Sequence, residues 1–334
     1  MIRVWILAEQ FDGRVADISF ELLARALKLN HGEVGVLLIG PPLAESELRR
    51  LNNAGATLTA AYESVTLTHF RIEPHMHCFV EFVGEYQPEI ILAGATPYGR
   101  TLMPYAAMRL HTGLTADCTE LAIEPDTGLL LQTRPAIGGN IMATIKCPVH
   151  RPQMATVRPH STVPARPGEG VVDGGRIVRI AADRLPESGM KIAGFEPFAG
   201  QLNLSDAKRV VVVGRGIKKA ENLPMIFELA EALGAAVGAS REVVDRGWLG
   251  YQHQIGLSGK TVSPEFYLGI GVSGAIQHLA GMQNAGRIMA VNKDPEAGIF
   301  KVADFGLVGD LFEIVPELTR QLRQGGASWL NTAK

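Results

Sequence analysis

This chain of 334 residues has few cysteines, no excess of either charge and no long apolar run. Its three cysteines, Cys78, Cys118 and Cys147, form no CxxC pair, which argues against a disulfide framework, structural zinc or a chain-borne iron–sulfur cluster. No apolar run reaches the ~18 residues that a membrane span requires. The 32 Lys and Arg nearly balance the 34 Asp and Glu, so neither nucleic acid nor an anionic membrane is an expected partner.

The N-terminus also lacks the features of a targeting segment. MIRVWILAEQ begins directly with a strand pattern and has neither a charged leader nor a small-residue cleavage site. We therefore expect a cytoplasmic protein.

The run HMHC at 75–78 has the composition of a metal cluster. Residues two apart do not share a helix face, however, which leaves His75 and Cys78 as the only usable pair. We expect no metal here and interpret the segment as a solvated helix with one buried cysteine.

The sequence has 37 glycines and 46% hydrophobic residues, which suit a compact α/β protein. Apolar strands alternate with helical stretches over the first ~110 residues and again from Lys208 onward. We predict two three-layer domains with parallel sheets, 1–195 and 205–324, and a tail at 325–334. The Pro- and Gly-rich segment 159–200 provides the linker.

Two loops of the first domain are ambiguous. Gly94-Ala95-Thr96 is expected at the carboxyl edge of the first sheet, as a ligand site or as a structural loop. Residues 128–158 alternate like β-strands around a turn at Gly138–Asn140, where positive φ permits a close approach. Arg134 precedes a proline and should be extended and point outward. It is either an anion or flavin contact at a subunit face or the exposed arginine of a plain hairpin, and the residues alone favour the plain hairpin.

The most informative stretch is YLGIGVSGAIQHLAGMQNAGRIMAVN at 267–292, which has the pattern strand, glycine turn, helix, strand. We expect a turn at Ser273-Gly274 and a helix over Ala275–Met282. Free N–H groups at a helix start can bind a phosphate or pyrophosphate, and His278 can reach toward the ring that the phosphate carries. The alternative is a buried βαβ unit whose glycines only permit close packing.

Three more turns are expected at the same sheet edge: a Gly-Arg-Gly turn at 214–216, Ser240-Arg241, and a Gly-rich turn at 256–259. Lys219 occupies the third glycine position of G-x-G-x-x-G, so a generic dinucleotide fingerprint is not supported. Arginines and hydroxyls from these turns, together with His278, would surround one pocket. Such a pocket suits a dinucleotide with a polar redox ring.

Segments of the second domain resemble the alpha subunit of electron transfer flavoproteins in order and spacing. The segments are GRGIKKAEN, AAVGASREVVD, GLSGKTV, YLGIGVSGAIQHLAGM and AVNKDPEAGIFKVADFGLVGDLFEIVPEL. The first domain resembles the family more loosely, and its LLQTRPAIGGNIMATI and HRPQMATVRP resemble the subgroup that performs flavin-based electron bifurcation. The resemblance implies an FAD-binding second domain and a heterodimer with a beta subunit. That subunit holds AMP in simple members and a second FAD in bifurcating ones.

The resemblance also implies roles for individual residues. Arg241, Ser258 and His278 are expected to tune the redox behaviour of the FAD, and no catalytic acid or base is expected. Asn292 and Asp310 are expected at the adenosine end. The expected FAD-binding residues are Arg215, Ser240, Arg241, Ile255, Gly256, Leu257, Ser258, Ser273, Gly274, Ala275, Ile276, Gln277, His278, Asn292 and Asp310.

Two residues depart from the pattern of simple members, which usually carry glutamine where Leu257 stands and threonine where Ser258 stands. The hydroxyl is retained, so a hydrogen bond to flavin N5 is expected. The amide is lost, so the redox behaviour of simple members does not carry over directly.

The expected function is electron transfer between NADH or the beta-subunit flavin and a dehydrogenase, within flavin-based bifurcation. The dehydrogenase would act on an acyl-CoA, an enoyl-CoA or a hydroxy acid, and ferredoxin is a candidate acceptor. Three alternatives stay open. One is a simple single-FAD shuttle from acyl-CoA dehydrogenases. The others are an NAD-dependent enzyme on the same fold, with His278 as its only candidate base, and a non-redox nucleotide-binding module.

Overall fold

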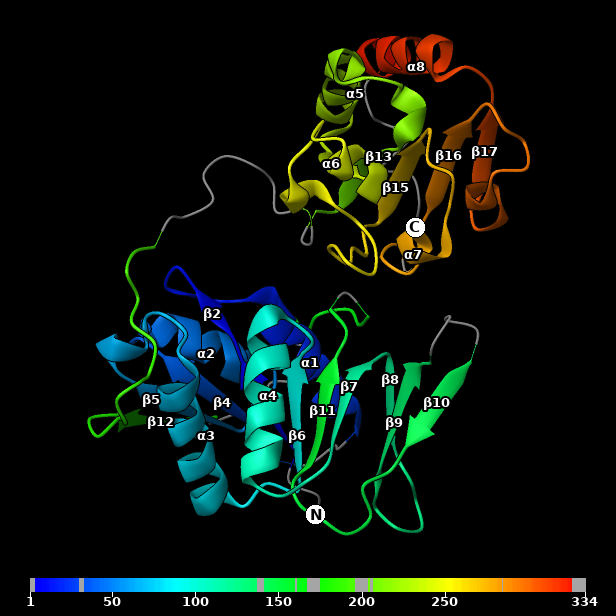
Figure 1. The fold of residues 1–334 in the computed structure, drawn as a ribbon. Coiled ribbons are helices and arrows are strands. Elements are labelled where there is room, and N and C mark those ends of the chain that lie inside the picture. The colour runs from blue at the N-terminus through cyan, green and yellow to red at the C-terminus, as the bar shows by residue number, and fades with distance from the viewer. Residues whose placement is uncertain are drawn as a thin grey trace. The chain divides into compact units, whose positions relative to one another are not determined.

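The computed structural model describes residues 4–29, 33–136, 141–159, 161–166, 175–195, 204, 207–283 and 285–325. The chain divides into two compact units, Met1–Phe195 and Glu196–Lys334. Each unit has its own parallel sheet (Figure 1). Each also has its own buried cores. The α/β class expected from the sequence is therefore confirmed. The predicted turn at 138–140 and the tail from 326 onward lie outside the described residues.

The first unit is built on a seven-stranded parallel sheet with the order β12-β5-β4-β1-β6-β11-β7. Strands β1, β4 and β6 are buried along their whole length because helices cover both faces. The last strand of this unit, β12, pairs with β5 at the edge of the sheet. The strands are β1 Val4–Ala8, β4 Val34–Gly40, β5 Leu58–Glu63, β6 Ile90–Gly94, β7 Leu114–Cys118, β11 Gln153–Val157 and β12 Arg176–Ala181.

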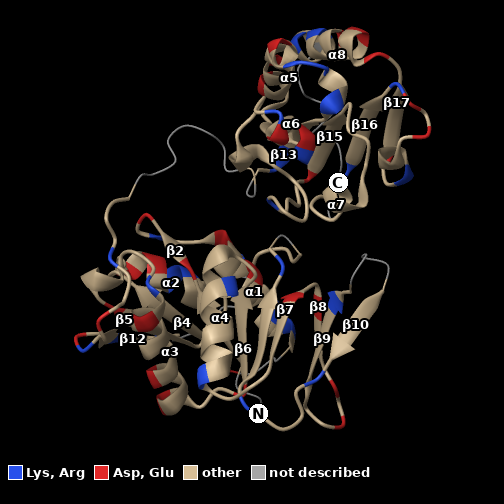
Figure 2. Cartoon of the chain, viewed as in Figure 1, with Lys and Arg blue, Asp and Glu red and all other residues tan. Residues whose placement is uncertain are grey.

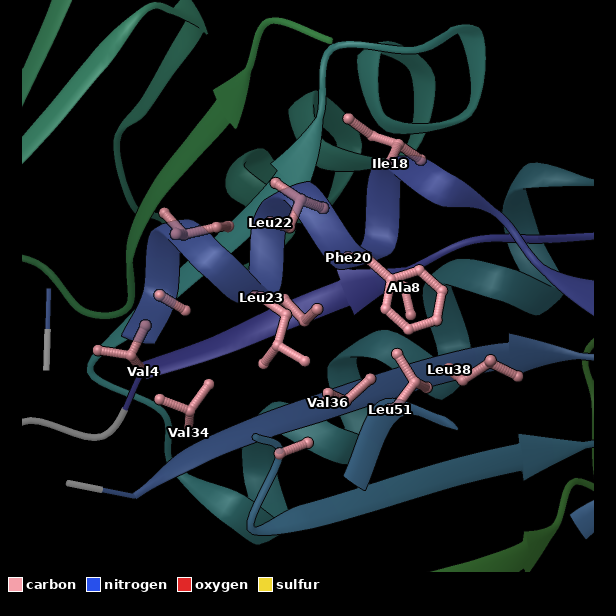
Figure 3. Packing of buried hydrophobic residues seen from close by; sticks show 14 of the residues in the cluster. Val4, Ala8, Ile18, Phe20, Leu22, Leu23, Val34, Val36, Leu38 and Leu51 are labelled. Carbon is pink, nitrogen blue, oxygen red and sulfur yellow. The ribbon is translucent and has the colours of Figure 1, made fainter. Parts of the chain in front are cut away.

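Successive side chains of a strand point to opposite faces, and this alternation gives the first unit two cores. Val4, Ile6 and Ala8 of β1 pack against α1 (Asp17–Leu29) and α2 (Glu45–Asn53). Figure 3 shows this packing, with Leu22 and Leu23 of α1 over the strand residues. Each fully buried Leu or Val side chain contributes about 1.5–3 kcal/mol relative to exposure.

The alternate residues of β1, Trp5 and Leu7, form the second core on the opposite face of the sheet. There they meet α3 (Ile72–Tyr86) and α4 (Pro97–Arg109). The first unit is therefore three-layered, as expected.

Several short elements extend the first unit. A three-stranded antiparallel sheet joins β8 (Glu120–Ile123), β9 (Leu130–Pro135) and β10 (Met142–Ile145). Arg134 lies on β9 opposite Ala143 and is half-buried, so it does not point fully outward as predicted. The remaining short elements are β2 Gln10–Phe11, β3 Arg14–Val15 and η1 Val65–Leu67.

The second unit has a five-stranded parallel sheet with the order β14-β13-β15-β16-β17. Helices α5 (Pro224–Leu233), α6 (Arg241–Asp245) and α8 (Leu311–Gly325) cover one face. The other face is covered mainly by turns and by two one-turn helices, α7 (Ile276–Leu279) and η5 (Gly298–Lys301). The strands are β13 Arg209–Val213, β14 Ala236–Ala239, β15 Phe266–Ile270, β16 Ile288–Asn292 and β17 Phe305–Val308.

Helix α7 is shorter than the Ala275–Met282 helix predicted from the sequence. Gly274 adopts φ 80° and Ala275 is extended, so the helix begins only at Ile276. Beyond Leu279 the chain continues in tight turns, in which the Gly281 amide donates to the His278 carbonyl. A single turn has few aligned peptide dipoles, so it lacks the strong positive end that a long helix would offer to an anion.

Charged residues lie mainly on helices and loops, and most strand residues of both sheets are uncharged (Figure 2). Within the described ranges, no helix combines the length and apolarity that crossing a bilayer would demand. The remaining short helices of the second unit are η2 Arg215–Ile217, η3 Ala220–Asn222 and η4 Tyr251–His253.

Candidate functional site

The strand order of the second sheet reverses between β13 and β15. The chain adds β14 on one side of β13, and it adds all later strands on the other side. Ligands of open α/β sheets bind at the carboxyl ends of the strands that flank such a point. A cavity of about 940 Å³ lies here, within the size range of cofactor sites.

Glycines bring the two chain segments that leave β13 and β15 into backbone contact. The Gly214 amide donates to the Ile270 carbonyl at 2.8 Å, and the Gly216 amide donates to the Gly271 carbonyl at 3.1 Å. A Cβ atom on Gly214 would lie 2.2 Å from the Gly271 oxygen, and Gly271 itself adopts φ 63°. Only glycine fits at 214, 216 and 271, which we call the glycine floor of the cavity. No side chain covers the backbone there.

The structure gathers 13 of the 15 predicted binding residues around this one cavity. The two others are Gly274 and Ile276. Gly274 packs against η5, where an added Cβ would lie 2.0 Å from the Ile299 nitrogen. The Ile276 side chain is 70% exposed. The predicted residues that line the cavity are Arg215, Ser240, Arg241, Ile255, Gly256, Leu257, Ser258, Ser273, Ala275, Gln277, His278, Asn292 and Asp310.

The fold adds residues that the sequence reasoning missed. Most of them flank a predicted residue, so the signal available was their position beside a strand end. Lys218 does not adjoin a predicted residue. Its backbone adopts φ 70°, and its ammonium group lies 4.8 Å from the centre of the Phe312 ring. The additional lining residues are Gly216, Lys218, Glu242, Asp245, Gln254, Gly271, Val272, Lys293, Asp294, Ala297, Gly309, Leu311 and Phe312.

Two arginines at the cavity are held by carboxylates. Arg215 lies 3.1 Å from Glu242, which also binds Arg246, and Arg241 lies 3.2 Å from Asp245. Hydrogen bonds from Arg246 and then Arg215 lower the pKa of Glu242. Both cavity arginines are more than two-thirds exposed, and such ion pairs contribute only about 0–1 kcal/mol. The guanidinium groups can therefore exchange these partners for a phosphate at little cost.

His278 has a protein partner for each ring nitrogen. Nδ1 lies 3.0 Å from the Ile255 carbonyl oxygen, which can only accept, so Nδ1 carries a proton. Nε2 lies 2.7 Å from the Tyr267 hydroxyl. Burial lowers the pKa of His278 to about 4, so the ring is neutral and Nε2 accepts from Tyr267. At neutral pH His278 therefore supplies a polar, uncharged surface to the cavity.

The turn at Ile255–Ser258 is locked onto α7. The Leu257 amide donates to the Gln277 carbonyl at 2.8 Å. A Cβ atom on Gly281 would lie 2.5 Å from the Gly256 nitrogen, so the two segments pack backbone to backbone. On its outer side, the Tyr251 hydroxyl donates to the Ser258 carbonyl at 2.6 Å. The Ser258 hydroxyl thus occupies a fixed place at the cavity wall.

Asn292 and Asp310 complete the far side of the cavity. The Asn292 amide nitrogen donates to the Val272 carbonyl at 2.9 Å, and its oxygen accepts from the Asp294 amide. Asp310 accepts from the Phe312 amide at 2.9 Å and thereby caps α8. Both side chains are anchored through one or two atoms to the local backbone.

The corresponding edge of the first sheet is closed. A Cβ atom on Gly94 would lie 2.8 Å from Ile18 and 2.9 Å from the Glu9 carboxylate. Thr96 donates to this carboxylate at 2.7 Å. Burial raises the pKa of Glu9 to about 7, and the Thr96 hydrogen bond opposes the increase. Of the two interpretations of 94–96, the structure therefore favours the structural loop.

The pair His75 and Cys78 is buried on α3. His75 Nδ1 lies 2.9 Å from the Arg71 carbonyl, and burial lowers its pKa to about 4. Burial also raises the pKa of the Cys78 thiol to about 12. Nowhere in the described ranges do three His, Cys, Asp or Glu side chains gather as metal ligands would.

A bare glycine floor, exposed arginines, a serine hydroxyl and a neutral histidine surround one cavity at the switch point of a doubly wound sheet. This combination fits an elongated anionic cofactor with a polar ring, and it defines a dinucleotide-binding α/β protein.

Comparisons with known proteins identify the family. The model described as "Electron transfer flavoprotein domain" matches residues 4–184, and "Electron transfer flavoprotein FAD-binding domain" matches residues 203–283. The electron transfer flavoprotein subunit alpha of Thermoanaerobacterium thermosaccharolyticum is 46% identical over 327 residues, covering 96% of this chain and 98% of that protein. The chain belongs to the electron transfer flavoprotein alpha-subunit family. Its cofactor is FAD, and it pairs with a beta subunit.

Two further relatives carry more specific names. The "Lactate dehydrogenase (NAD(+),ferredoxin) subunit LctC" of Acetobacterium woodii is 40% identical over 325 residues, covering 94% of this chain and 75% of that protein. The "Acryloyl-CoA reductase electron transfer subunit beta" of Anaerotignum propionicum is 38% identical over 353 residues, covering 96% of each chain.

Proposed function

We propose that the cavity of the second unit holds the FAD. The exposed cations Arg215 and Arg241 bind its phosphates or the edge of its ring, because guanidinium groups donate to anionic oxygens in a fixed fork. The turn at 255–258 and His278 line the ring. Asn292 and Asp310 receive the adenosine end. The observation that supports these roles is the convergence of the predicted residues on one cavity.

We further propose that the chain works in flavin-based electron bifurcation. In this scheme NADH delivers electrons to a flavin of the beta subunit, and the FAD of this chain passes electrons to a dehydrogenase, with ferredoxin as the second acceptor. The likeness to LctC supports this, because that relative's name couples a dehydrogenase with NAD(+) and ferredoxin. The acceptor would be a CoA-thioester or hydroxy-acid enzyme, in keeping with both named relatives.

Bound FAD supplies the electron-carrying chemistry, and the protein binds and tunes it. Arg241 adds positive charge at the ring or at the phosphates. His278 contributes a neutral polar group, since its proton on Nδ1 is already bonded to Ile255. The glycines at 214, 216 and 271 carry no side chains, so backbone groups there would be free to contact the cofactor. No side chain of the cavity is required as a general base.

Flavin stoichiometry tests the proposal. The chain would be produced with its beta subunit, the pair purified, and FAD and AMP extracted and counted. We expect two FAD per heterodimer and bleaching of the flavin absorption by NADH. One FAD with one AMP would instead indicate a simple single-FAD shuttle.

A matched pair of variants assigns the two flavins. Arg241→Ala alters the cavity of the second unit and should weaken retention of one FAD only. Arg134→Ala alters β9 of the first unit, outside this cavity, and should leave the FAD of the second unit bound. Equal losses from both variants would contradict the assignment of the FAD to the second unit.

A further inference from the structure

Gln254 is a buried polar side chain beneath the turn that lines the cavity, with 4% of its surface exposed. Its backbone is fixed on both sides, because its amide donates to the Tyr251 carbonyl at 2.9 Å and its carbonyl accepts from the Lys260 amide at 2.7 Å. Its neighbour Ile255 bonds to the Ala239 carbonyl, which ties the turn to the end of β14. The Gln254 side chain therefore has little freedom to move.

The Gln254 side chain meets the Ser258 hydroxyl. Nε2 of the amide donates to Ser258 Oγ at 3.1 Å. A serine hydroxyl has one proton to donate and can accept two hydrogen bonds. The Gln254 bond uses an acceptor position, so the proton of Ser258 must point elsewhere. Among the described residues no hydrogen bond from this proton is formed, and Ser258 itself lines the cavity.

We infer that Gln254 is a positioning residue, which fixes the Ser258 hydroxyl as a hydrogen-bond donor to an acceptor atom of the flavin. In this amide orientation the nitrogen that faces Ser258 cannot accept, so Ser258 does not donate to Gln254 and its proton is directed toward the ligand. The ligand atom that fits is an unprotonated ring nitrogen or a ring carbonyl oxygen. This inference rests on the proposed placement of the FAD in this cavity.

Gln254→Glu tests the orientation because it preserves shape but replaces the donor with a carboxylate, which only accepts. The Ser258 proton should then turn toward the new carboxylate and away from the flavin. We expect FAD to bind about tenfold more weakly, which corresponds to the loss of one hydrogen bond. The midpoint potential of the FAD should also fall, because a hydrogen-bond donor stabilises the negative charge that the ring gains on reduction.

The added charge could lower the potential by itself, so the test is a double-mutant cycle with Ser258→Ala. FAD affinity and midpoint potential would be measured for the alpha–beta pair in all four combinations. If Gln254 acts through Ser258, the Gln254→Glu effect is much smaller in the Ser258→Ala background. An equal effect in both backgrounds would overturn the inference, since charge or packing alone would then explain it.

Two further variants complete the design. Tyr251→Phe removes the bond to the Ser258 carbonyl but leaves the hydroxyl bond intact, so its effect should not depend on Ser258→Ala. Gln254→Met removes the donor without adding charge and serves the same cycle if the glutamate variant does not fold. A parent pair that takes up no FAD would refute the proposed function, whereas FAD uptake without coupling would refute only the role of Gln254.

Discussion

Tyr267 is a buried tyrosine whose hydroxyl bonds only to His278 among the described residues. Its ring lies over Gly269, where an added Cβ would come within 3.1 Å of it. The space above this glycine thus lets a side chain from the start of β15 reach His278, which lines the cavity. Tyr267, His278 and the Ile255 carbonyl form one hydrogen-bonded row beneath the cavity.

Tyr267→Phe should destabilise the second unit, because it leaves His278 Nε2 buried without a donor. An unsatisfied buried acceptor costs about 1–3 kcal/mol. The free energy of unfolding from urea titration would measure this loss. Tyr62→Phe is the matched control, since Tyr62 is equally buried but its hydroxyl makes only a 3.4 Å bond to Glu85. Similar losses of stability in both variants would contradict a specific stabilising role for the Tyr267–His278 hydrogen bond.

Glu9 should make the first unit less stable as the pH rises. Its pKa is raised from 4.5 to about 7, so the folded chain retains a proton that the unfolded chain releases between these values. The free energy of unfolding therefore falls as the pH rises from about 4.5 through about 7. The difference between the two pKa values corresponds to roughly 3 kcal/mol.

Glu9→Gln should abolish this loss, because the amide is uncharged at every pH. Denaturant titrations between pH 4.5 and 8 would give the free energy of unfolding of the variant and of the parent. In the difference between the two, the opposite contributions of His75 and His278 cancel. Those histidines have pKa values lowered to about 4, so they add stability as the pH rises toward 6.5. Glu47→Gln is a control, since the pKa of Glu47 is lowered instead. A pH-independent difference for Glu9→Gln would contradict the argument.

At this scale, the sequence predicted which residues gather but not how they are oriented. The turns after parallel strands could be expected at one edge, and the resemblance added the specific positions. Two features could not be predicted, because each depends on a contact between distant segments. These are the protein partners of both His278 nitrogens and the amide of Gln254 beneath Ser258.

At the scale of elements, α7 and the turn at 255–258 are packed backbone to backbone and form one structural unit. Gly281 and Gly256 approach so closely that neither position has room for a side chain. The turn is therefore placed by the backbone of the 276–282 segment rather than by its own side chains. This explains why two glycines 25 residues apart belong to one structural requirement.

Gly281→Ala should displace the turn without unfolding the sheet. The new methyl group would lie 2.5 Å from a backbone nitrogen, and such overpacking costs about 1–3 kcal/mol. We expect FAD binding to weaken about ten- to hundredfold, with an unchanged far-UV circular dichroism spectrum. Gly84→Ala is a control, since nothing lies near its Cβ position in α3 and alanine favours the helix. Equal FAD affinity in both variants would show that the contact is dispensable.

The long elements could be predicted because their apolar periodicity is strong, as in β4 and α1. The missed elements lack such a signal. β8 is only four residues long and alternates between exposed and half-buried positions. The length of α7 was wrong because Gly274 and the turn after Leu279 are set by packing against η5 and the 255–262 segment.

At the scale of the whole molecule, the two units have separate sheets and separate cores, and each should unfold as its own cooperative transition. FAD binds only the second unit in the proposed function. A hundredfold excess over the dissociation constant stabilises the unit that binds it by about 2.7 kcal/mol. Calorimetry of the alpha–beta pair should therefore show one transition of this chain shifted upward by FAD. A uniform shift of every transition would contradict independent units.

The last strand of the second sheet, β17, pairs with β16 on one side, and all four of its residues are exposed. Phe305, Leu307 and Val308 are 63%, 41% and 59% exposed. An apolar edge strand is a template for adding further strands, including those of identical chains. Copies of this chain therefore present this edge to one another when they are concentrated. The fraction of this chain that is recovered in solution should therefore fall as its concentration rises.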